Sequence, residues 1–275
     1  MNVGRRFDGK NVIVIGGGSE GSAESDAPMG NGRAIALRLA QEGATVVVTD
    51  LDLQRAQQTV DALESQRGVA LQADAASIED SAAIAPRAEA AVGPIDVVVC
   101  NVGITGALPG RVQTVDDWAL VNDVNVRSHW LAAQSALPGM LERGSGAFVF
   151  VTSIAGLICS GTSLSYEASK ASLLAVSRHF GVRYADRGIR SNSVALGVID
   201  STMVRREFGD DNSLGRQRDL MQPMRRQGDP AESAAAVAFL ASSDASFITG
   251  QCLVVDGGRT VDGGYDRRYR AELTQ

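Results

Sequence analysis

The sequence predicts a Rossmann-type α/β fold, a doubly wound parallel sheet of about seven strands with helices on both faces. Short apolar runs rich in β-branched residues recur along the chain, and longer segments of helical periodicity separate them. Strands that are buried on both faces read as continuous apolar runs, and their alternation with helices is typical of repeated βαβ units. No internal repeat or Pro/Ser-rich linker divides the chain. We therefore expect residues 1–275 to form a single domain.

The elements follow from these patterns in order. The expected strands are the apolar runs at residues 11–15, 44–50, 68–74, 95–100, 146–153, 189–195 and 251–257. The expected helices carry apolar residues three to four positions apart, at residues 33–42, 53–66, 77–92, 116–141, 166–187 and 230–241. Residues 201–229 are a polar interlude long enough for a substrate lid, although a solvated surface loop explains them as well. Residues 259–275 form a C-terminal tail.

Composition narrows the partners and the compartment. A net charge of -6 gives no basic surface of the kind that binds nucleic acid. Cys100, Cys159 and Cys252 match neither a disulfide framework nor a metal-binding spacing, so we expect no metal and a reducing cytoplasm. The N-terminus lacks a signal-peptide core, and no apolar run is long enough to cross a membrane. The expected partner is a small molecule.

A glycine-rich segment at residues 15–36, IGGGSEGSAESDAPMGNGRAIA, joins the first strand to the first helix. In that position glycines let the backbone approach a pyrophosphate, and the helix N-terminus offers N–H donors. If Gly17 and Gly21 formed the loop, the helix would run through Pro28 and further glycines, which break it. We therefore expect the dinucleotide loop to consist of Gly16, Ser19, Gly30, Asn31 and Gly32.

This alignment makes residues 20–29 an insertion in the cofactor loop, and the helix would start at Arg33. Glu20, Glu24 and Asp26 would meet like-charge repulsion on a pyrophosphate, so we expect them to face water. We expect the insertion to fold over the bound cofactor as a flap that slows cofactor release.

Two carboxylates end the second and third expected strands. Asp50 can accept hydrogen bonds from both ribose hydroxyls and would repel a 2′-phosphate, which favours NAD over NADP. The structural alternative is a strand-end Asp that completes a turn. Asp74 could reach the adenine edge, or it could cap the helix that follows.

The segment SYEASKAS carries the candidate chemistry. Tyr166 and Lys170 lie four positions apart on an expected helix and share one face. A free phenol has a pKa of about 10, and an ammonium that lowers it by about 2 to 3 would make the phenol a usable base. A half-buried tyrosine beside a surface lysine is the alternative. Ser153, which ends the preceding strand, favours proton transfer.

At these residues the sequence resembles the short-chain dehydrogenase/reductase family, and the resemblance covers nearly the whole chain. The motifs that carry it are the glycine loop, Asp74, Cys100-Asn101-Val102-Gly103, Asn125 in VNDVNV, Ser153, Tyr166-x-x-x-Lys170, Leu196-Gly197 and Asp256-Gly257-Gly258. The resemblance implies a Rossmann-type sheet that binds NAD(H) or NADP(H).

The resemblance also implies residue roles. Tyr166 would be the catalytic acid/base, Lys170 would lower its pKa and hold the nicotinamide ribose, and Ser153 would hydrogen-bond the substrate oxygen. Asn125 would sit in a bent helix and hold a water of the proton relay. The further residues expected to contact the cofactor are Asn101, Gly103, Gly197, Ile199 and Ser201; those expected to face the substrate are Ile154 and Cys159, beside Ser153 and Tyr166.

The chain departs from the family pattern at four positions, and the smallest of these changes is Val102 in place of the usual Ala. Ile15 replaces a Thr whose hydroxyl ties the glycine loop to the fourth-strand turn, so we expect one hydrogen bond there to be missing. Leu196 replaces a Pro beside the nicotinamide, and Ser201 keeps a hydroxyl where a Thr is usual. None of these changes removes a catalytic group.

The predicted function is therefore interconversion of a secondary alcohol and a ketone by hydride transfer with NAD(H). An NADPH-dependent reductase of ketones or ketoacyl compounds and a catalytically silent dinucleotide sensor are the alternatives. The apolar and small residues of the helices at 116–141 and 166–187, together with the family resemblance, predict a homotetramer or homodimer. His129 and His179 fall outside the motifs and are expected to be structural.

Overall fold

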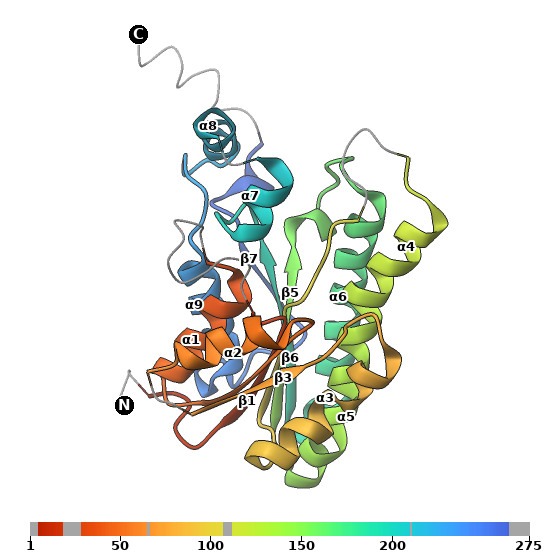
Figure 1. Ribbon diagram of the computed structural model, residues 1–275, viewed down its shortest axis with the longest axis vertical. Helices are drawn as coiled ribbons and strands as arrows, with labels where there is room; N and C mark the ends of the chain where they lie inside the picture. Colours follow the sequence, from red (N-terminus) through yellow and green to blue (C-terminus); the bar gives the residue numbers. More distant parts are fainter. Residues whose placement is uncertain (1–4, 19–28, 65–66, 107–111, 210, 264–275) are drawn as a thin grey trace.

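The computed structural model describes residues 5–18, 29–64, 67–106, 112–209 and 211–263. Its centre is a seven-stranded sheet in the order β3-β2-β1-β4-β5-β6-β7, in which every pair of neighbours is parallel (Figure 1). The strands are β1 (Asn11–Ile15), β2 (Thr45–Asp50), β3 (Gly68–Gln72), β4 (Val97–Cys100), β5 (Gly146–Ser153), β6 (Ile189–Leu196) and β7 (Cys252–Val255). The predicted fold class is confirmed, and each strand lies where an apolar run predicts it.

Helices cover both faces of the sheet (Figure 1). Apolar residues of α1 and α9 pack with one face, and those of α3, α5 and α6 pack with the other. The helices are α1 (Asn31–Gln41), α2 (Leu53–Asp61), α3 (Ile78–Val92), α4 (Val115–Asn122), α5 (Ser128–Arg143), α6 (Leu164–Arg183), α7 (Thr202–Phe208), α8 (Asn212–Leu220) and α9 (Pro230–Ala241). Polar side chains start several of them: Thr114 and Asp117 form a capping box at α4, and Asp229 and Glu232 form one at α9.

The strand order reverses beside β1, which pairs with β2 on one side and β4 on the other. Ile15, the last residue of β1, lies opposite Thr49 and Cys100, so the carboxyl ends of the three strands meet at one edge. In open α/β sheets this reversal leaves a crevice where ligands bind.

The helix predicted over residues 116–141 is interrupted. A π-helical turn at Asp123–Arg127 separates α4 from α5. Such turns widen the backbone ladder by one residue and are frequent at functional sites. Asn125 lies in this turn, as the bent helix implied by the family resemblance requires.

The polar segment 201–229 contains two helices, α7 and α8, and is therefore not an extended solvated loop. The buried Arg218 connects them: its Nη1 donates to the carbonyl oxygens of Phe208 (3.3 Å) and Gly209 (2.9 Å), and its Nε donates to Gln227 (2.9 Å). In Figure 1 the two helices lie above the sheet.

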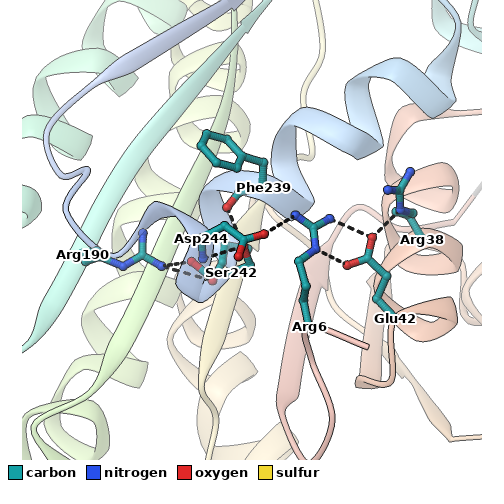
Figure 2. Close-up of polar contacts among 8 residues, drawn as sticks. Arg6, Arg38, Glu42, Arg190, Phe239, Ser242 and Asp244 are labelled. Atoms are coloured by element: carbon teal, nitrogen blue, oxygen red, sulfur yellow. Dashed lines mark hydrogen bonds and ion pairs between the residues drawn. The ribbon is translucent and has the colours of Figure 1, made fainter. Parts of the chain in front are cut away.

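A cluster of charged side chains connects the first described residues of the chain to the turns that follow α1 and α9. Figure 2 shows Arg6 between Glu42 and Asp244. The Arg6 Nη2 atom donates to Glu42 Oε1 at 2.8 Å, and Nη1 donates to Asp244 at 3.3 Å. Burial alone would raise the pKa of Glu42, but hydrogen bonds from Arg6 and Arg38 outweigh burial and hold that pKa below its usual 4.5. The pair contributes stability while Glu42 is ionised.

We expect Glu42→Gln to lower the free energy of unfolding by about 2 kcal/mol at pH 7, because it removes charge-assisted hydrogen bonds to two arginines. A folded-state pKa below that of the unfolded chain stabilises the fold above the unfolded value, so the deficit should shrink as the pH falls below 4.5. Urea unfolding at fixed protein concentration measures it. Asp8→Asn, which breaks the exposed Arg5–Asp8 pair, is the control and should cost less than about 1 kcal/mol.

Candidate active site

A cleft of about 350 Å³ opens at the carboxyl ends of the strands. It brings together residues from the whole length of the chain. Of the predicted site residues it is lined by Gly16, Gly30, Asn31, Gly32, Asp50, Asp74, Asn101, Gly103, Ser153, Tyr166, Lys170, Gly197, Ile199 and Ser201. The cleft is therefore one site, which extends from the glycine loop to the Tyr166 hydroxyl.

The glycine loop fits a phosphate because its backbone is close to the first helix. Gly30 precedes α1 and provides no capping side chain, and a Cβ added at Gly32 would collide with the carbonyl oxygen of Gly16. Gly16 itself has a φ of 73°, a conformation that favours glycine. The helix begins at Asn31, so it does not run through Gly30 as the rejected alignment requires.

The loop is fixed by two side chains in the absence of the usual Thr at position 15. Asn101 Nδ2 donates to the Gly16 carbonyl oxygen at 2.8 Å, and the buried Thr59 Oγ1 donates to the Gly17 carbonyl oxygen at 2.9 Å. Thr59 was not predicted from the sequence, because nothing in its helix distinguishes it from a packing residue.

Ser19 and all of the predicted insertion except Met29 fall in residues 19–28, outside the described part of the chain. The expected water-facing orientation of Glu20, Glu24 and Asp26 therefore stays a prediction.

The two strand-end carboxylates lie along the cleft in different ways. Asp50 accepts hydrogen bonds from the backbone N–H groups of Gly18 and Asp52, each at 3.1 Å, and burial raises its pKa. Asp74 accepts from Ala76 N at 2.8 Å. The side chain that caps α3 is Ser77, so Asp74 is not the cap that the structural alternative proposed.

Ser153, Tyr166 and Lys170 meet at the floor of the cleft. Ser153 ends β5 and forms a hydrogen bond with the Tyr166 hydroxyl. Lys170 Nζ lies 5.6 Å from the centre of the Tyr166 ring and donates to the Val151 carbonyl oxygen at 3.3 Å. One serine, one phenol and one ammonium thus line the same part of the cleft.

The electrostatics differ from the sequence expectation. Burial raises the pKa of Tyr166 to about 12; the hydrogen bond with Ser153 opposes this increase, and the carboxylate of Glu207 adds to it. Burial lowers the pKa of Lys170 to about 8. The expected lowering of the Tyr166 pKa is therefore wrong for the chain by itself, because desolvation of the phenolate outweighs the hydrogen bond with Ser153.

Asn125 lies beneath the cleft and is fully buried. Its Nδ2 donates to the Ile104 carbonyl oxygen (2.9 Å) and to Ser169 Oγ (3.0 Å), and its Oδ1 accepts from Ile104 N (2.8 Å). These contacts connect the π-helical turn to the loop that follows β4 and to α6. The Asn125 side chain thus fixes the position of Ser169, the residue before Lys170.

Two residues predicted to face the substrate do not line the cleft. Ile154 is buried directly after Ser153. The Cys159 thiol donates to the Glu167 carboxylate at 3.0 Å, and the same carboxylate accepts from Ser160 Oγ at 2.7 Å and from Thr162 N at 3.2 Å. The Glu167 carboxylate therefore organises the turn between β5 and α6, and the Cys159 thiol is bonded to this carboxylate instead of lining the cleft.

Residues of α7 also line the cleft, and none of them was predicted individually from the sequence. Within the polar segment, Thr202, Met203, Val204 and Arg206 face it. The only sequence signal was the length and polarity of the segment.

His129, which is expected to be structural, is buried with both ring nitrogens unpartnered in the described chain, and burial together with Lys170 lowers its pKa to about 3.

Neither a metal site nor a membrane span is present in the described ranges. No three His, Cys, Asp or Glu side chains are grouped there as metal ligands would be. Likewise, none of the described helices combines the length and apolar character needed to cross a membrane.

Known proteins resemble this chain along most of its length. A family model described as enoyl-(acyl carrier protein) reductase matches residues 27–260. A cyclohexanol dehydrogenase of Acinetobacter sp. (strain SE19) is 35% identical over 258 residues, which cover 93% of this chain and 96% of that protein. A cis-4-hydroxycyclohexanecarboxylate dehydrogenase of Sinomonas cyclohexanicum is 38% identical over 237 residues, covering 85% of this chain and 94% of that protein.

A solved structure gives the same result. A short-chain dehydrogenase/reductase from Burkholderia xenovorans superposes with a TM-score of 0.85 at 33% identity, over 94% of this chain and 98% of that one. With the seven-stranded sheet and the motifs along its edge, these matches establish that the chain belongs to the short-chain dehydrogenase/reductase family of NAD(P)-dependent alcohol dehydrogenases and carbonyl reductases.

Proposed function

We propose that this enzyme oxidises a secondary alcohol to a ketone with NAD⁺, and that Tyr166 is its acid/base. The observation that carries the proposal is that Ser153, Tyr166 and Lys170 line one cleft, with Ser153 hydrogen-bonded to Tyr166 and the Lys170 ammonium 5.6 Å from the Tyr166 ring centre. A protein that only sensed a dinucleotide would not need this set, which argues against the silent alternative.

The residues of the cleft fit a dinucleotide. The close approach of Gly16 and Gly32 leaves room for phosphate where any side chain would intrude, and the N-terminus of α1 faces the same place. Asp50 lies where the adenosine ribose would be, and its carboxylate favours hydroxyls over a 2′-phosphate. When bound, the nicotinamide supplies the carbon that takes up or returns the hydride.

Tyr166 would take the hydroxyl proton during oxidation and return it during reduction, while Ser153 donates to the substrate oxygen. Burial disfavours the phenolate, so Tyr166 needs a positive charge nearby to act as a base at neutral pH. Lys170, whose pKa of about 8 leaves it mostly protonated at pH 7, supplies one such charge. The raised pKa of Tyr166 also favours faster oxidation at alkaline pH.

The substrate class follows from the relatives. Proteins named for cyclohexanol and for cis-4-hydroxycyclohexanecarboxylate both act on a hydroxyl attached to a ring, so we propose a cyclic secondary alcohol. The match to a family described as an acyl carrier protein reductase keeps the ketoacyl alternative as the second candidate. An NAD⁺-coupled screen of cyclic alcohols beside an NADPH-coupled screen of ketones and ketoacyl compounds separates the two.

We also propose that the enzyme assembles through α4, α5 and α6. Trp118, Leu120 and Trp130 are 42%, 49% and 46% exposed, and Ala171 and Ala175 are exposed on α6. Other residues expected at this surface are buried within the chain's own core: Val121, Val124 and Leu174. The remaining aromatic surface favours a homotetramer, with a homodimer as the smaller alternative.

Tyr166→Phe should fold and bind NAD but lose turnover by roughly 100- to 10,000-fold, because the phenyl ring keeps the packing and removes the proton. Steady-state kinetics on the best substrate of the screen measure the loss. Tyr184→Phe, at the far end of α6, should keep wild-type rates. Retention of more than about a tenth of the activity by Tyr166→Phe would refute the assignment.

Asp50→Ala should narrow the preference for NAD over NADP, because it removes the acceptor for ribose hydroxyls and the repulsion of a 2′-phosphate. The ratio of kcat/KM for the two cofactors is the measurement. Asp61→Ala, an exposed change at the end of α2, is the control. Asp50→Asn serves as a second variant if the alanine protein does not fold. An unchanged ratio would mean that Asp50 does not contact the ribose.

Light scattering at micromolar concentration should give four times the monomer mass. Trp130→Glu should reduce it, because a charge on this surface opposes burial. Ala185→Glu, in the turn after α6, is the control. A monomeric wild-type protein would exclude the proposed assembly.

A further inference from the structure

Glu207 belongs to helix α7, which contributes residues to the cleft wall. Met203 and Arg206 line the cleft, and residues three and four positions apart share one face of a helix. Glu207 is one turn beyond Met203 and adjacent to Arg206. Its side chain is only 8% exposed, so α7 carries a buried carboxylate one helical turn from Met203, which lines the cleft.

This carboxylate is incompletely paired. Its Oε1 accepts from Arg206 Nη2 at 3.3 Å, and the Arg206 side chain is 50% exposed, so this contact is weak. Its Oε2 is buried and has no hydrogen-bond partner within the described residues. A buried carboxylate oxygen without a donor costs free energy, and such groups in native proteins usually await a ligand, a water or an ion.

The carboxylate is also close enough to the reacting centre to affect it. The negative charge of Glu207 raises the pKa of Tyr166, so the carboxylate is within electrostatic reach of the phenol. A donor that paired with Glu207 would remove the unsatisfied oxygen and weaken its opposition to the phenolate. One substrate group would thereby improve both binding and proton transfer.

We propose that Glu207 is a substrate-recognition residue that accepts a hydrogen bond from a second polar group on the alcohol. This inference rests on the function proposed above and narrows its substrate class. The substrate is a secondary alcohol that also carries a hydroxyl or an ammonium, as a diol or an amino alcohol does. A plain alcohol leaves Oε2 unpaired, and an alcohol bearing a carboxylate meets like-charge repulsion.

The kinetic test compares cyclohexanol, cyclohexane-1,4-diol and 4-aminocyclohexanol on the wild type, Glu207→Gln and Glu207→Met. The wild type should prefer the donor-bearing alcohols. Glu207→Met should lose roughly 10- to 100-fold in kcat/KM for them, the range for a hydrogen bond to a charged group, and should keep or raise kcat/KM for cyclohexanol, because the charge that opposes the phenolate is removed. Glu207→Gln should keep more activity on the diol than on the amino alcohol, because an amide accepts from a hydroxyl but carries no charge.

Glu64→Gln, an exposed carboxylate after α2, is the matched control and should change none of these rates. The proposal is overturned if the wild type shows no preference for the diol or the amino alcohol, or if Glu207→Met affects all three alcohols equally.

Two further measurements do not depend on turnover. Calorimetry on Tyr166→Phe with NAD⁺ should show tighter binding of the diol or amino alcohol than of cyclohexanol, and the difference should vanish in Tyr166→Phe/Glu207→Met. If no alcohol is oxidised but this difference is found, the proposed function fails and Glu207 recognition stands. Glu207→Met should also keep or raise the Tm; a lower Tm would show that the carboxylate is paired and structural, which contradicts the proposal.

Discussion

The active site depends on the packing of α6 against β5. Thr152 Oγ1 donates to the Lys170 carbonyl oxygen at 2.8 Å, and Lys170 Nζ returns to the Val151 carbonyl oxygen at 3.3 Å. Gly156 makes the approach feasible, because a Cβ there would lie 2.7 Å from the Lys170 carbonyl carbon. These contacts fix the helix against the strand, so Ser153 at the strand end meets Tyr166 one turn before Lys170.

Burial at this contact has a chemical consequence. It opposes the charged form of both Tyr166 and Lys170, which raises the pKa of the phenol and lowers that of the ammonium. A phenolate and an ammonium formed side by side stabilise each other more strongly in that environment than in water. The site therefore disfavours either charge alone, and positive charge brought by a bound cofactor would shift the balance towards the phenolate.

The sheet and the Ser153, Tyr166 and Lys170 set could be predicted from the sequence because both are local signals. Buried parallel strands produce apolar runs, and two residues four apart on a helix share a face in any context. The support of the glycine loop by Thr59 could not be predicted, since it depends on how α2 packs. The orientation of Cys159 was also out of reach, because it follows from Glu167, a neighbour in space eight positions away.

Substrate recognition is the least predictable part of the site, because it also depends on contacts between residues that are distant in the sequence. Helix α7 contributes no residue that is buried as a whole, and the expected lid at residues 201–229 is held by polar contacts such as those of Arg218 and the Arg205–Asp200 ion pair. Such contacts leave no periodic apolar pattern in the sequence. Residues of this segment can therefore be substituted without disturbing the sheet, because they make few contacts with the hydrophobic core. A buried and incompletely paired Glu207 therefore costs less here than the same group would cost under the sheet, and the proposed role of Glu207 in substrate recognition depends on this difference.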